Sequence, residues 1–145
     1  MTGMTPTPRW AAAALTIVAL LCLANGAHGE TRRHYANKYV MMVDWLTRTE
    51  MWVTTHLEDV ELCRWAHAIA ERHVELAQRM TPPSELAAVH PHLLLAMENA
   101  ERMFDNAAAG DRKAYRRHRR IVHEEFRLIA ELLQANGIYL PTMAP

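Results

Sequence analysis

Apolar residues recur every three to four positions through most of the chain after residue 31, which is the period of an α-helix. In the stretch 112–136 they form a single stripe, and the arginines lie on the opposite side. The members of this stripe are Ala114, Tyr115, Ile121, Val122, Leu128, Ile129, Leu132 and Leu133. The stretches 56–80 and 84–109 show the same one-sided pattern. No stretch alternates with the two-residue period of a β-strand, so we expect an all-α protein.

Proline and glycine divide this helical sequence into segments. Residues 31–80 contain neither of them, whereas Pro82-Pro83 and Gly110 interrupt the sequence that follows. Asp111, directly after Gly110, is a good N-cap residue for the last helix. Both interruptions are typical of short connections between helices.

Further capping signals set the expected helix ends. Thr55 and Glu58 match the S/T-x-x-E capping box at the midpoint of the long uninterrupted segment. Ser84 is the expected N-cap of the third helix, and Asn136-Gly137 is a typical helix C-terminus. We therefore expect helices at about 32–53, 56–80, 84–109 and 112–136.

Four helices of similar length with short connections predict an up-down four-helix bundle over residues 30–145. The alternative is one long N-terminal helix, 31–80, with a C-terminal helical hairpin packed on part of it. In that alternative a second copy of the chain would cover the rest of the long helix. A turn without Gly or Pro near residue 55 is the weakest element of the four-helix prediction.

The N-terminus has the pattern of a secretory signal peptide. Arg9 is its only charged residue, and the uncharged apolar run 10–23 is too short to span a membrane comfortably. Ala27 and Gly29 place small residues at positions −3 and −1 before Glu30. We expect residues 1–29 to be removed and the protein to be exported, to the periplasm or the extracellular space. The alternative is a retained membrane anchor.

Charge and cysteine content narrow the class of protein. The formal net charge is zero over 145 residues, whereas a nucleic-acid-binding domain is expected to be basic. We therefore expect no nucleic-acid partner. Cys22 lies within the leader, so Cys63 is the only cysteine of the mature chain, and an intramolecular disulfide is excluded.

The first helix differs from the others because it has two apolar stripes. One is the expected core stripe, and the second consists of Met41, Trp45 and Trp52 on another side of the helix. A helix that is apolar on two sides is covered on both or binds a partner. We expect these three residues to form an interface, either with a second copy of the chain or with another protein. The alternative is a wide core stripe in a crowded bundle.

Histidine, cysteine and carboxylate residues are candidates for a metal site. Cys63 and His67 are four residues apart and share one helix face. In an up-down bundle Glu101 and His118 come to a similar height. These residue types bind Zn²⁺ and similar divalent ions, so Cys63, His67, Glu101 and His118 form the predicted metal site. The alternatives are simple pairing of buried His and Glu, and binding of haem.

Six cations occur within nine residues near the start of the last helix. They are Arg112, Lys113, Arg116, Arg117, Arg119 and Arg120. The helix macrodipole disfavours positive charge at this end of a helix. The alternatives are ion pairs with Glu98, Glu101 and Asp105 of the preceding helix, or a surface for an anionic envelope component or an acidic partner.

Sequence motifs of enzymes and cofactor proteins are missing. The chain has no Glu-x-x-His pair, no His-Glu-x-x-His and no Cys-x-x-Cys-His. We therefore expect a non-enzymatic, partner-binding protein of the cell envelope, self-associating or bound to another protein. No cofactor is assured, and a metal- or haem-binding envelope protein is the alternative function.

Overall fold

The computed structural model describes residues 30–138 and is all-helical in that range. Its elements are α2 (Arg32–Thr55), α3 (Val60–Arg79), the short 3₁₀ turn η1 (Ser84–Leu86), α4 (His90–Ala108) and α5 (Arg112–Ala135). No strand occurs in this part of the chain, so the predicted all-α class is confirmed. The predicted leader, residues 1–29, lies outside the described residues.

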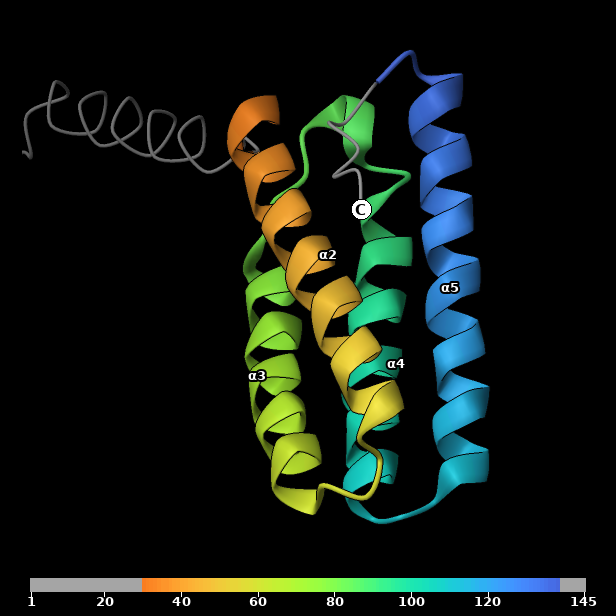
Figure 1. Cartoon of the computed structure of the whole chain (residues 1–145). Coiled ribbons are helices and arrows are strands. Elements are labelled where there is room, and N and C mark those ends of the chain that lie inside the picture. The colour runs from red at the N-terminus through yellow and green to blue at the C-terminus, as the bar shows by residue number, and fades with distance from the viewer. Residues whose placement is uncertain (1–29, 139–145) are drawn as a thin grey trace, which may run out of the picture.

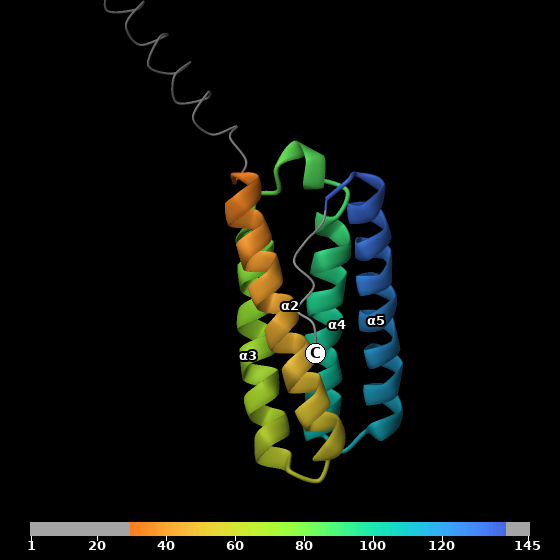
Figure 2. The same ribbon diagram turned by 45° about the horizontal axis from the view of Figure 1, so that its top comes forward.

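The four helices lie side by side as a bundle (Figure 1). α4 packs along both α3 and α5, and α2 lies across this group (Figure 2). Trp45 of α2 contacts α3, whereas Glu50, further along α2, hydrogen-bonds with α5. The α2–α3 and α4–α5 connections lie at one end of the molecule, and η1 lies at the other (Figure 1).

The uninterrupted segment 31–80 is two helices, so the alternative of one long helix is wrong. α2 ends at Thr55, and the N-cap of α3 is Asp59, whose carboxylate accepts a hydrogen bond from the Leu62 amide at 2.9 Å. The capping box predicted at Thr55 is therefore wrong. A carboxylate is favoured at a helix N-terminus by the macrodipole as well as by its hydrogen bond. The Thr55 hydroxyl instead donates to the Met51 and Trp52 carbonyls within α2.

The start of α4 also differs from the prediction. Ser84 begins only the short turn η1, and α4 begins at His90, six residues later than expected. Pro91 accounts for this difference because proline lacks the N–H that an inner helix position needs and fits in the first turn. The predicted N-cap of α5 is confirmed, since the Asp111 carboxylate accepts a hydrogen bond from the Ala114 amide at 2.8 Å.

The core lies between the four helices, with large apolar side chains from α2, α4 and α5 and small ones from α3. Its fully buried members include Met42, Leu46, Cys63, Leu93, Met97, Phe104, Tyr115 and Ile129. Cys63 is a buried free thiol. None of the helices between residues 30 and 138 has an apolar stretch long enough to cross a membrane.

Candidate metal centre

Histidines make many of the polar contacts between the helices. The contacts link His67 to Glu101, His90 to Tyr35, His92 to Glu125, His118 to Asn99 and His123 to Glu50. Each pair joins two different helices. A buried or half-buried polar group costs free energy unless it finds such a partner, so these contacts first satisfy the imidazoles.

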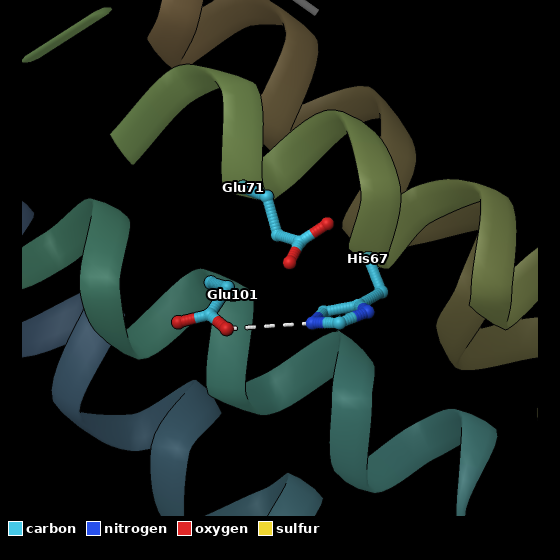
Figure 3. Close-up of side chains that lie close together, drawn as sticks. All are labelled: His67, Glu71 and Glu101. Atoms are coloured by element: carbon cyan, nitrogen blue, oxygen red, sulfur yellow. Dashed lines mark hydrogen bonds and ion pairs between the residues drawn. The ribbon is translucent and has the colours of Figure 1, made fainter. Parts of the chain in front are cut away.

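One of these contacts includes a third potential ligand. His67 and Glu71 lie one turn apart on α3, and Glu101 faces them from α4 (Figure 3). Their ligand atoms all lie within 4.8 Å of one another. Among residues 30–138 this is the group of three whose donor atoms could share one metal ion. We call His67, Glu71 and Glu101 the His–Glu cluster.

The geometry of the His–Glu cluster differs from that of an ordinary hydrogen bond. His67 Nε2 lies 3.4 Å from Glu101 Oε1, whereas His92 Nδ1 lies 2.7 Å from Glu125 Oε2. A strong charge-assisted hydrogen bond between nitrogen and a carboxylate oxygen is about 2.7–2.9 Å long. The His67–Glu101 contact is therefore weak as a hydrogen bond and leaves the donor atoms free to bind another group.

The His–Glu cluster is open to solvent on one side. The side chains of His67 and Glu101 are 26% and 33% exposed, and Glu71 is exposed. An ion can therefore enter without local unfolding.

Cys63 and His118, the other two predicted ligands, lie outside the His–Glu cluster. Burial, followed by the charges of Asp59 and Glu58, raises the pKa of the Cys63 thiol and disfavours the thiolate that binds metals. His118 is already occupied by Asn99 and by a guanidinium of α5.

Both ring nitrogens of His118 have partners. Nδ1 donates to Asn99 Oδ1 at 2.9 Å, and Nε2 lies 3.2 Å from Arg117 Nη2, which donates to it. Burial and then the charges of Arg117 and Arg102 lower the pKa of His118, so the imidazole is neutral near pH 7. His118 is therefore a structural link between α4 and α5 in this arrangement.

Glu71 is the member of the His–Glu cluster that the sequence analysis missed. Its spacing of four residues from His67 places both side chains on one helix face, and this signal is visible in the sequence. Cys63 and His118 were predicted as ligands from their positions along the helix axes. Such positions do not show in which direction around its helix a side chain points.

The predicted interface of Met41, Trp45 and Trp52 is divided by the structure. Trp45 packs into the bundle, with its ring centroid 4.4 Å from that of His73 and 6.0 Å from that of Phe104. Met41 and Trp52 are 53% and 59% exposed. Trp45 therefore belongs to a wide core stripe, as the alternative interpretation expected, whereas Met41 and Trp52 face solvent.

The basic run of α5 does not pair with the acids of α4 that the sequence analysis considered. Within residues 30–138, none of its six cations forms an ion pair with Glu98, Glu101 or Asp105. Arg119 instead hydrogen-bonds with Glu50 of α2 at 2.5 Å. The alternative in which ion pairs with the preceding helix neutralise this run is therefore wrong.

Comparison of the chain with protein-family models, curated proteins and solved structures finds no match.

Proposed function

We propose that this chain is an exported up-down four-helix bundle that binds one divalent transition-metal ion between α3 and α4. His67, Glu71 and Glu101 are the protein ligands. The observation that carries the proposal is the approach of their three donor atoms to within 4.8 Å of one another. Export rests on the apolar run 10–23 and the small residues that follow it. The up-down topology rests on the positions of the connections at alternate ends (Figure 1).

The spacing of the donor atoms suits a shared ion. Two ligand atoms bound to tetrahedral Zn²⁺ at about 2.0–2.1 Å are about 3.3–3.4 Å apart. His67 Nε2 and Glu101 Oε1 lie 3.4 Å apart, so both can bind with little movement. Glu71 is exposed, and a rotation of its side chain brings its carboxylate to the same ion.

The donor set favours Zn²⁺ or a similar transition-metal ion over Ca²⁺ and Mg²⁺. One imidazole and two carboxylates suit Zn²⁺, whereas Ca²⁺ and Mg²⁺ prefer oxygen ligands alone. The two carboxylates balance the ion's double positive charge. Three protein ligands leave one tetrahedral position for water or an external donor, which is a feature of exchangeable and catalytic zinc sites.

The proposal is tested on purified chain 30–145 by elemental analysis and by titration with Zn²⁺. We expect one ion per chain and at least about a tenfold loss of affinity in His67→Ala, since even groups that only orient a ligand contribute about that much. His92→Ala is the matched control, because His92 also pairs with a glutamate across two helices and its side chain is 34% exposed. A chain that binds no metal, or equal losses in the two variants, contradicts the proposal.

A second candidate function is the binding of a protein partner, including a second copy of this chain. The exposed side chains of Met41 and Trp52, together with Trp65 of α3 at 55% exposure, favour it. Tryptophan is enriched among the residues that dominate binding at interfaces. Mass measurement of the wild type and of Trp52→Glu by light scattering tests self-association. A wild type that is monomeric at all concentrations excludes a second copy as the partner.

A further inference from the structure

The cations near the start of α5 form one exposed surface together with a cation of α4. We call this surface the basic face, and its members are Arg102, Arg112, Lys113, Arg116, Arg117 and Arg120. We infer that the basic face binds a linear polyanion that carries phosphate groups along its length. This site is separate from the His–Glu cluster and does not depend on metal binding.

The charges of the basic face are not neutralised by side chains of residues 30–138. All sixteen acidic residues of the chain lie in residues 30–138, so every carboxylate side chain belongs to the described part. No ion pair in that part includes a member of the basic face. Glu101, the α4 acid next to Arg102 in the sequence, contacts His67 of α3 instead.

Arg127, also on α5, is neutralised by acids of its own helix, unlike the members of the basic face. Arg127 has Glu124 three residues before it and Glu131 four residues after it, and it forms ion pairs with both. Arg112 and Lys113 of the basic face lie in the first turn of α5, where the macrodipole disfavours cations. The sequence therefore concentrates unpaired charge where it does not stabilise the fold, and an external anion offsets that cost.

A buried histidine holds part of the basic face in place. Arg117 Nη2 donates to Nε2 of His118, and His118 is fixed in turn by Asn99. Arg102 and Arg117 both lower the pKa of His118, which shows that the two guanidiniums lie near the same imidazole. The basic face thus includes cations of both α4 and α5 and at least one oriented guanidinium, a group well suited to bind phosphate.

The shape of the basic face favours a linear polymer over a bilayer. Arg112 and Arg117 are separated by about 140° around the axis of α5, and residues 112–120 extend over about 12 Å. A flexible polymer chain can curve around such a convex surface. A flat membrane contacts only the residues at its middle. The apolar side chains of α5, such as Val122 and Ile129, are buried in the bundle and cannot insert into lipid.

The inference is tested by titrating the mature chain with long-chain inorganic polyphosphate at about 50 mM and about 200 mM salt. We expect binding that weakens at least about tenfold at the higher salt, because several counterions are released when the cations bind. Arg116→Glu with Arg120→Glu should weaken binding at least tenfold at low salt. The matched control is Arg72→Glu with Arg79→Glu on α3, which changes the net charge equally and should retain affinity within threefold.

Three outcomes overturn the inference. One is the absence of polyphosphate binding at low salt. Another is an equal loss in the two double variants, which would show that only net charge matters. The third is preferential binding to phosphatidylcholine vesicles that contain about one-third phosphatidylglycerol, which would make a membrane surface the ligand. Circular dichroism of each variant shows that the bundle is folded, and zinc binding by the variants shows that the His–Glu cluster is intact.

Discussion

Glu50 of α2 accepts a hydrogen bond from Nε of Arg119 in α5 at 2.5 Å, although the Glu50 residue is only 8% exposed. The same carboxylate oxygen lies 2.7 Å from Nε2 of His123. A further hydrogen bond between α2 and α5 joins Thr54 to Tyr115 at 2.7 Å. The C-terminal half of α2 is thus joined to α5 by three polar contacts, two of which involve the buried carboxyl group of Glu50.

Removal of the Glu50 carboxylate should destabilise the protein. Glu50→Ala leaves Arg119 without its ion-pair partner, and we expect a loss of about 1–3 kcal/mol in the free energy of unfolding. The exposure of Arg119 limits the loss, because water replaces part of the interaction. Denaturant unfolding followed by circular dichroism measures it. Glu124→Ala removes an exposed carboxylate of α5 and should change stability much less than Glu50→Ala does.

Acidification should weaken the fold through three histidines. Burial lowers the pKa of His73, His90 and His118 below the ordinary value of 6.5. The ring of His73 packs against Trp45. His90 lies near Tyr35 and Glu30, and His118 lies near Arg102 and Arg117. The unfolded chain therefore binds more protons than the folded chain below pH 6.5, so this stability is present above 6.5 and is lost as the pH falls.

The pH prediction is measured by urea unfolding at several pH values between about 7.5 and 5. NMR titration should place the pKa of His118 below 6.5. His118→Gln should lose less stability than the wild type over the same interval, because one source of proton uptake on unfolding is gone. A His118 that titrates above 6.5 would contradict the prediction.

The break between α2 and α3 gives a third prediction. Asp59→Ala removes the cap of the Leu62 amide and should cost about 1 kcal/mol of stability. Glu58→Ala changes the neighbouring acid, which caps no amide in the described structure, and should cost less. Equal effects from the two substitutions would show that charge alone, and not the capping hydrogen bond, stabilises the start of α3.

The two tryptophans of α2 should respond differently to truncation. Trp45→Ala removes a ring that packs against His73 and Phe104, and we expect a loss of about 2–4 kcal/mol. Trp52 is mostly exposed and stacks on His56, so Trp52→Ala should cost less than about 1 kcal/mol. Similar losses in thermal or denaturant unfolding of the two variants would contradict the different packing of these side chains.

The helical pattern and the capping signals were enough to predict the class of the fold and most helix ends, including the end of α5 at Asn136-Gly137. Local competition determined the break between α2 and α3 and the start of α4. Asp111 follows Gly110 and is the suitable cap at that place, so it was predicted correctly. Near the middle of 31–80, Thr55 and Asp59 compete as caps, and the charged Asp59 is used. The start of α4 depends on Pro91, whose missing N–H excludes it from an inner turn.

The candidate site was predicted only in part, because helix periodicity gives direction around one helix but not the orientation of two helices. His67 and Glu101 share a height and also face each other, so both belong to the His–Glu cluster. His118 shares the height but faces Asn99, and Cys63 is fully buried. The spacing of four residues places Glu71 beside His67, and the packing of α3 against α4 brings Glu101 to both of them.

The most direct test of the proposed metal binding is a titration of metal-free chain 30–145 with Zn²⁺, comparing wild type, Glu71→Ala and Glu75→Ala. We predict one ion per chain in the wild type and at least about a tenfold loss of affinity in Glu71→Ala, because a ligand is removed. Glu75 lies one turn further along α3 and pairs with Arg72, so its variant should bind like the wild type. A wild type that binds no zinc, or a Glu71→Ala variant that binds it unchanged, would contradict metal binding by the His–Glu cluster.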